Sequence, residues 1–211
     1  MRAELTTYRD GDVELDVMVW RLVDPMIVAS TASCGGGVGA RDWIVNAQVA
    51  HDFERRDLDQ YVAGVATGLG LRGSGVGMLT AARVRRHQRV LDDGVEVDAT
   101  VGLSHPAWAA ANDEADDGAG TTGTINVVVR VPVHLEEGAL LNALVTATEA
   151  KSQALYDAGV AGTGTPSDAV CICCRLEGSP ERFAGPRSRW GARLARGVYG
   201  AVLAGAREWV A

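Results

Sequence analysis

The sequence is short of lysine and has no long apolar run. Only Lys151 among its 20 basic residues is a lysine, and the net charge is −7. A chain with a net negative charge is a poor partner for nucleic acid or an anionic membrane. No run approaches the roughly 18–20 apolar residues that a membrane helix needs, and residues 1–17 lack the apolar segment of a secretory signal. We therefore expect a cytoplasmic protein that binds neither nucleic acid nor membranes.

Metal ligands and nucleotide-binding loops are also missing. Cys171, Cys173 and Cys174 have no second cysteine pair elsewhere to complete a metal site, and His51 has no second histidine at metal-ligand spacing. Neighbouring residues of a strand point to opposite faces, so Cys173 and Cys174 cannot easily share one ion. CGGGVGA at 34–40 matches neither GxGxxG nor a P-loop, and no GxSxG elbow is present. We expect buried free thiols, no metal and no cofactor.

Periodic apolar patterns predict strands interspersed with helices. The length of 211 residues and a hydrophobic content of 47% suit one domain over residues 1–211. The predicted strands cover 13–20, 25–31, 43–50, 75–81, two arms around Asp92-Asp93-Gly94, 124–135 and 168–177. The predicted helices cover 57–71, 136–159 and 188–210. Because strands and helices do not alternate strictly, we expect an α+β fold with a mixed or largely antiparallel sheet and helices packed on it.

The helix at 136–159 places the only lysine on its apolar face. At 100° per residue, Lys151 falls beside Leu140 and Leu144, whereas Glu149 points away. A buried ammonium without a partner is costly, so this position favours proton transfer or the binding of an anionic group. In the alternative, the helix overhangs the core and Lys151 reaches water along its apolar stem.

Two loops rich in threonine and glycine flank this helix. GAGTTGTIN at 118–126 leads into one predicted strand, and AGTGTPSDA at 161–169 leads into the next. Glycine lets the backbone approach a ligand closely, and successive N–H groups can bind an anion or an oxyanion. Each loop alone is typical of an ordinary turn. With Lys151 between them, the two loops predict one site.

The same segments resemble the adenosylcobinamide amidohydrolases over roughly residues 26–203. GTIN at 123–126, TEAK at 148–151 and GTGT at 162–165 form the specific combination. VGMLTAA at 76–82, TVGLSHPAW at 100–108 and STASCGGGVGARDWIVNAQV at 30–49 are similar to other motifs of the family. Two departures are His105, where the family often has asparagine, and the insertion of Pro166 and Ser167 before Asp168.

The resemblance implies hydrolysis of the amide that joins aminopropanol to the corrin ring of adenosylcobinamide. The cobalt would arrive within this small-molecule substrate, which agrees with the lack of a metal site. The resemblance assigns no catalytic residue and no oligomeric state. Side-chain chemistry favours Lys151 or Glu149 for proton transfer.

Polar groups suited to the amide or its oxyanion complete the candidate site. We expect Thr124 and Asn126 to orient the amide or stabilise the oxyanion. The candidate substrate-binding residues are Asn46, Thr80, His105, Thr163, Thr165 and Asp168. Trp43 and Trp108 are candidates to cover the macrocycle. Two alternatives stay open: a non-catalytic corrinoid carrier, and a hydrolase that cleaves itself before Thr121, Thr122 or Thr124.

Overall fold

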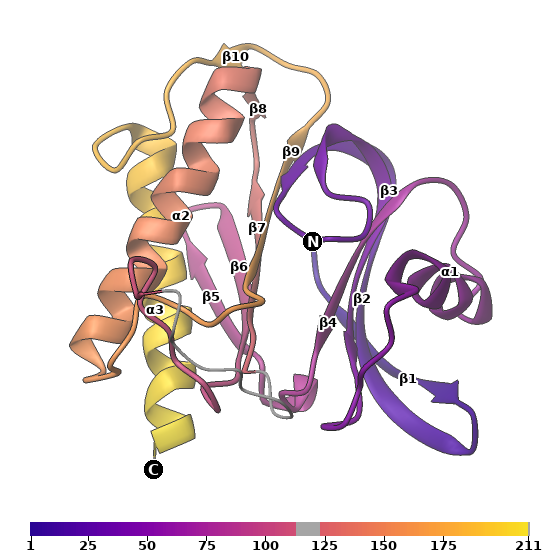
Figure 1. The fold of residues 1–211 in the computed structure, drawn as a ribbon. Coiled ribbons are helices and arrows are strands. Elements are labelled where there is room, and N and C mark those ends of the chain that lie inside the picture. Colours follow the sequence, from indigo (N-terminus) through magenta and orange to yellow (C-terminus); the bar gives the residue numbers. More distant parts are fainter. Residues whose placement is uncertain (113–122, 211) are drawn as a thin grey trace.

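One eight-stranded sheet organises the chain in the computed structural model, which describes residues 1–112 and 123–210 (Figure 1). Its strands run in the order β4-β3-β2-β9-β7-β6-β5, and β1 pairs with β2. They are β1 (Glu4–Asp10), β2 (Val13–Ser30), β3 (Gly37–Gln48), β4 (Gly75–Thr80), β5 (Gln88–Asp92), β6 (Val95–Val101), β7 (Ile125–Val131) and β9 (Ala169–Arg175). The helices are α1 (Leu58–Gly68), α2 (Glu137–Asp157), α3 (Arg189–Val210) and the 3₁₀ turn Val84–Arg86. Two short strands, β8 (His134–Leu135) and β10 (Pro180–Glu181), pair in parallel.

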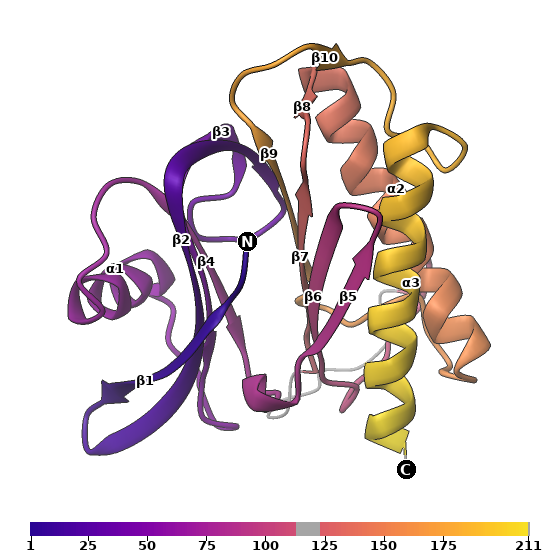
Figure 2. The ribbon, with the colours of Figure 1, turned by 180° about the vertical axis from the view of Figure 1, so that it is seen from behind.

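The long β2–β3 ribbon bends over, so the two halves of the sheet face each other. The β2–β3 pairing shifts register between Arg21 and Met26, and the arch at this point is visible at the top of Figure 2. After the arch, the second half of β2 pairs with β9. The second half of β3 lies beside the first half of β2, and its other edge pairs in parallel with β4. The sheet is therefore mixed and mostly antiparallel, as the apolar patterns predict.

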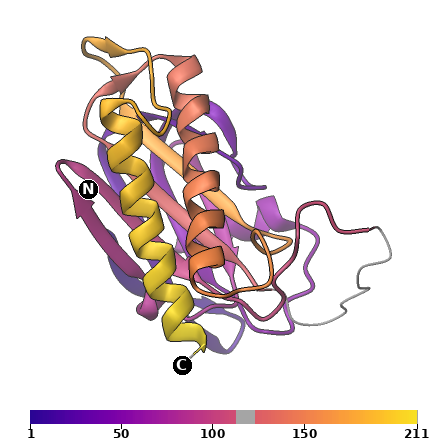
Figure 3. The same cartoon turned by 90° about the vertical axis from the view of Figure 1, so that its left-hand side faces the viewer.

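Three apolar cores separate the resulting layers. Helices α2 and α3 lie side by side (Figure 3) and pack on the outer face of β5, β6, β7 and β9. Helix α1 packs on the outer face of the other half. Between the two halves lies an inner core that includes Trp20, Met78, Val128 and Cys171. Each strand with alternating apolar residues thus serves two cores, because successive side chains point to opposite faces.

Local sequence signals explain several element ends. The hairpin at Asp93-Gly94 places both residues at positive φ, 43° and 94°, as a two-residue hairpin turn requires. Gly70 and Gly159 follow α1 and α2 at φ 67° and 76°, in the left-handed conformation that ends helices. No helix among the described residues is long and apolar enough to cross a membrane.

Four local predictions need correction. Strand β1 was not predicted, because ELTTYRD has few apolar residues and is held mainly by its pairing with β2. The segments 13–20 and 25–31 form one strand with an irregularity. Strand β7 ends at Val131 because Pro132 follows and cannot donate a backbone hydrogen bond. The helix predicted over 57–71 covers only Leu58–Gly68, and the carboxylate of Asp57 pairs with Arg55 rather than capping the helix.

Candidate active site

A cavity of about 430 Å³ opens at the end of the folded sheet opposite the arch. Strands β2 and β4 end here, and β7 and β9 begin here. We call it the strand-end cavity. The residues that line it are Thr31, Ala32, Ser33, Val49, Phe53, Arg55, Leu58, Gly77, Met78, Leu79, Thr80, Ala81, Thr124, Asn126, Pro166, Ser167, Asp168 and Ala169. Its volume falls within the range typical of small-molecule sites.

Lys151 reaches the base of this cavity and pairs with Asp168. Its side chain is buried on α2 and its ammonium contacts the Oδ2 of Asp168. The same carboxylate accepts hydrogen bonds from the backbone N–H groups of Ile125 (2.8 Å) and Thr165 (3.1 Å) and contacts the hydroxyl of Thr165 at 2.6 Å. Asp168 lines the cavity, whereas Lys151 stands behind it. The lysine therefore acts on the cavity through Asp168.

The ion pair is packed without spare room. A Cβ added to Gly164 would collide with both the Nζ of Lys151 and the Oδ2 of Asp168. Glycine at this position therefore allows the loop to close over the pair. Lys151 therefore lies directly against the GTGT loop.

Two hydroxyl groups stand on the cavity wall. The Thr124 and Ser167 oxygens are 2.6 Å apart. Ser167 also donates to the carbonyl of Gly123 (3.1 Å). The Thr165 hydroxyl has one proton, which it can give either to that carbonyl (2.7 Å) or to the Oδ1 of Asp168 (2.6 Å). When Thr165 donates to the carbonyl, Ser167 can turn its proton toward a ligand without leaving that carbonyl unpaired.

A chain of buried amides crosses the inner core next to the cavity. Asn126 on β7 donates to the Oδ1 of Asn46 on β3 at 2.9 Å, and Asn46 donates to Thr100 on β6 at 2.9 Å. Thr80, another cavity residue, accepts a hydrogen bond from the backbone of Ala82 at 3.1 Å. Asn46, Thr80 and Asn126 therefore lie together, although they come from three separate strands.

The remaining predicted residues lie away from the cavity lining. Glu149 is exposed on α2 and lines a groove with Pro186 and Tyr199. Thr163 binds the neighbouring loop, where its hydroxyl accepts from the N–H of Ala109 at 3.0 Å. His105 belongs to that loop, whose backbone packs against Gly123.

The two tryptophans proposed to cover the macrocycle are placed differently from each other. Trp43 is buried in the core under α1, so it does not face the cavity. Trp108 is 54% exposed on the loop that follows His105. Thr121 and Thr122, considered above as sites of self-cleavage, lie outside the described residues.

Ser167, Ser33, Phe53 and Arg55 line the cavity but were not sequence candidates. Ser167 follows directly from the Thr/Gly loop, so the loop pattern itself was the available signal. Phe53 lies in the segment HDFE at 51–54 and Arg55 follows it. This segment has the polarity of a surface turn. Their position depends on how the segment before α1 packs against the sheet. No local sequence pattern predicts that packing.

Titratable groups are few in the cavity. Arg55 and Asp168 are the charged residues in its lining. Across residues 1–112 and 123–210, no three His, Cys, Asp or Glu side chains are grouped to hold a metal ion. The cysteines are buried, and burial raises the pKa of Cys171 to about 12 and that of Cys174 to about 11. Cys173 and Cys174 face different cores, as adjacent strand residues must.

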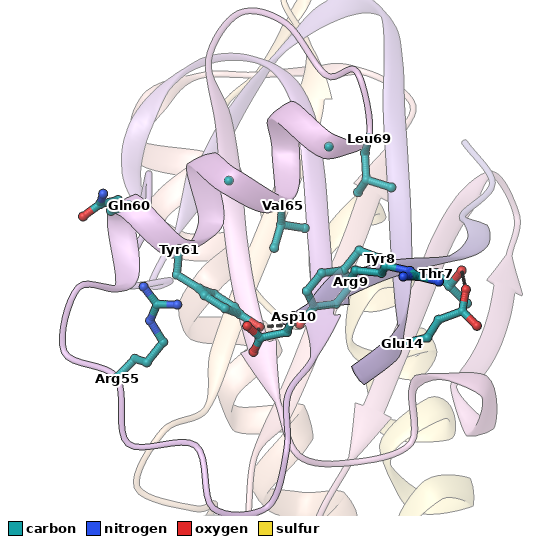
Figure 4. Close-up of a pocket in the computed structure, with 12 residues that line it drawn as sticks. Thr7, Tyr8, Arg9, Asp10, Glu14, Arg55, Gln60, Tyr61, Val65 and Leu69 are labelled. Atoms are coloured by element: carbon teal, nitrogen blue, oxygen red, sulfur yellow. Dashed lines mark hydrogen bonds between the residues drawn. The ribbon is translucent and has the colours of Figure 1, made fainter. Parts of the chain in front are cut away.

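A second cavity, of about 650 Å³, lies between α1 and the β1–β2 hairpin (Figure 4). Tyr8 and Tyr61 meet there at 2.6 Å between their hydroxyl oxygens, and Tyr61 donates to Asp10 at 3.0 Å. Burial raises the pKa of both tyrosines. We call it the α1 cavity. It contains none of the predicted site residues, although Arg55 borders both cavities.

The chain was compared with known proteins. Residues 2–211 match the family model for adenosylcobinamide amidohydrolase. An adenosylcobinamide amidohydrolase of Methanosarcina mazei is 28% identical over 186 residues, which cover 84% of this chain and 88% of that protein. One of Halobacterium salinarum is 31% identical over 206 residues, 94% of this chain and 85% of that protein. The chain therefore belongs to the adenosylcobinamide amidohydrolase family.

Proposed function

We propose that this enzyme hydrolyses adenosylcobinamide in the strand-end cavity, with the Lys151–Asp168 pair at its base. The reaction cuts the amide between aminopropanol and the corrin ring, and it releases adenosylcobyric acid and 1-amino-2-propanol in cobinamide salvage. One observation carries the choice of site: this cavity gathers side chains from the separate motifs around Thr80, Thr124 and Asp168. Its volume suits the aminopropanol arm, and we place the macrocycle at the mouth.

Amide hydrolysis makes three demands on the site. Water adds to the carbonyl carbon, the tetrahedral oxyanion needs hydrogen-bond donors, and the departing amine must receive a proton. Both protons of the water end on the amine, so the products are one carboxylate and one ammonium ion and the enzyme ends the cycle in its starting protonation state.

The hydroxyl pair is suited to the oxyanion. Thr124 and Ser167 stand together on the wall, and Thr165 can give its one hydroxyl proton to the carbonyl of Gly123 when Ser167 turns away. A donor that is already positioned stabilises developing charge without a cost of reorganisation.

The Lys151–Asp168 pair is suited to the proton transfer. Asp168 is the carboxylate in the described lining of the cavity, and the buried ammonium behind it carries the exchangeable protons. In this proposal the pair delivers a proton to the departing amine and recovers one from the attacking water.

The test of the hydroxyl pair is kinetic. Ser167→Ala and Thr124→Val should each lower kcat for aminopropanol release by about 100-fold, as the loss of an oxyanion donor does. Corrinoid binding, followed by the visible absorbance of the ring, should change little. Thr163→Val is the matched control, because Thr163 belongs to the same loop but does not line the cavity. Unchanged kcat in both cavity variants would remove the hydroxyl pair from the mechanism.

A further inference from the structure

Asn126 has a buried hydrogen-bond acceptor with no partner. Among the described residues, two buried side-chain atoms lack partners: the Nε1 of Trp43 and the Oδ1 of Asn126. Of these two residues, only Asn126 lines the strand-end cavity, and it is 2% exposed. A buried acceptor left unpaired costs free energy, so a ligand that donates a hydrogen bond to this oxygen would remove that cost.

The orientation of the Asn126 amide is determined by its neighbours. Its Nδ2 donates to the backbone carbonyl of Leu79 at 3.0 Å and to the Oδ1 of Asn46 at 2.9 Å. A backbone carbonyl is never a donor, so exchanging the nitrogen and oxygen of Asn126 would set two acceptors against each other. Both N–H hydrogens of Asn126 are used, and the oxygen is its only free group.

The rest of the network holds this orientation. Asn46 has to accept from Asn126 through its oxygen, so its own Nδ2 points to Thr100, at 2.9 Å. Asn46, Thr100 and Asn126 are each at most 2% exposed. Fully buried polar side chains that satisfy one another are held rigidly. The Oδ1 of Asn126 is therefore a fixed, buried acceptor in a residue of the cavity lining, and Asn126 has no N–H left to act as an oxyanion donor.

We propose that the Oδ1 of Asn126 accepts the N–H of the scissile amide and makes the enzyme selective for amides over esters. This inference rests on the proposed function, because it assumes that the scissile bond enters the strand-end cavity. The secondary amide of the aminopropanol arm supplies one N–H donor next to its carbonyl. With Asn126 bound to that N–H, the carbonyl oxygen is left for the hydroxyl pair Thr124–Ser167.

Selectivity follows from the chemistry of the two linkages. An ester replaces the N–H by an oxygen, which turns lone pairs toward the Asn126 oxygen and leaves that acceptor unpaired. Sites built to hydrogen-bond a substrate N–H reject the analogue that lacks it. Relative to the uncatalysed rates, the enzyme should therefore accelerate cleavage of the amide more than cleavage of the ester.

The experiment compares two substrates in three proteins. The substrates are adenosylcobinamide and its ester analogue, in which propane-1,2-diol replaces aminopropanol. Asn126→Ala should lower kcat/KM for the amide by at least about 10-fold and for the ester by less than about 3-fold. Thr100→Val is the matched control, since it shortens the same buried network but keeps the Asn126 oxygen. Thr100→Val should keep the wild-type ratio of kcat/KM for the amide to kcat/KM for the ester.

The outcomes separate this inference from the proposed function. An equal loss on both substrates in Asn126→Ala would mean a structural role and would overturn the inference. Should that variant fail to fold in a thermal melt, the wild type still decides, because an amide-to-ester rate ratio equal to that of the uncatalysed reactions contradicts an acceptor aimed at N–H. A wild type that releases no aminopropanol at all would instead refute the proposed function.

Discussion

At the scale of single residues, Lys151 depends on a partner that is distant in sequence. Helical spacing predicts its burial, and its side chain is indeed buried. Its partner Asp168 is 17 residues away, and periodicity carries no information about that pairing. The same is true of Asn46 and Asn126, which are 80 residues apart. The residue types of the site could be predicted from sequence, but their pairing depends on the folded sheet.

Replacing Lys151 by arginine tests whether the site needs an ammonium. The guanidinium keeps the charge, but it is bulkier and does not deprotonate, and Gly164 leaves no room beside the pair. We expect Lys151→Arg to lower kcat by at least about 100-fold, the low end for general acid–base catalysis.

A second variant controls for stability. Lys151→Met alone leaves Asp168 without its ion-pair partner, which typically costs about 3–5 kcal/mol. The double variant Lys151→Met, Asp168→Asn removes both charges and should melt closer to wild type while staying inactive. Near-normal turnover in Lys151→Arg would mean that Lys151 transfers no proton and only positions Asp168 through its charge.

At the scale of elements, strand β9 shows what alternation can and cannot predict. AVCICC at 169–174 is apolar throughout, and such a run predicts a strand buried on both faces. The strand is buried on both faces, between the inner core and the core under α2 and α3. The sequence prediction separates strands 13–20 and 25–31 at the register shift, but it does not show that one strand continues and bends there. That bend creates the open end where the strand-end cavity lies.

The cysteines of β9 should make stability fall at alkaline pH. Burial raises the pKa of Cys171 to about 12 and that of Cys174 to about 11, from an ordinary value of 9.0. Below about pH 9 both states hold the thiol protons. Above it the unfolded chain loses them first, so the free energy of unfolding falls until the folded pKa is reached.

Urea denaturation at stepped pH measures this effect. A variant with Ala at Cys34, Cys171, Cys173 and Cys174 should lose less stability between about pH 9 and 10, with the decrease from Tyr8 and Tyr61 remaining above that range. Its turnover should stay close to that of wild type, because no thiol lines the strand-end cavity. A steep alkaline loss that persists in the variant would assign the effect to other groups.

At the scale of the whole molecule, the chain should act uncleaved and without an added metal. No group of metal ligands is present in the described ranges. We expect active enzyme to show the full 22.1 kDa mass and to keep its turnover in a chelator. Activity found only in protein cleaved before Thr124, or lost with chelator and restored by zinc, would contradict this expectation.

The choice between the two cavities is the central claim, and filling each one in turn tests it most directly. Ser33→Trp fills the strand-end cavity. Gly64→Trp fills the larger α1 cavity, at a position where an added Cβ meets no atom within 4 Å. The measurement is the rate of 1-amino-2-propanol release from adenosylcobinamide by folded protein. We predict a loss of at least about 100-fold in Ser33→Trp, since a misplaced substrate costs about this much, and near-normal release in Gly64→Trp. The reverse pattern would contradict the account and place the reaction in the α1 cavity.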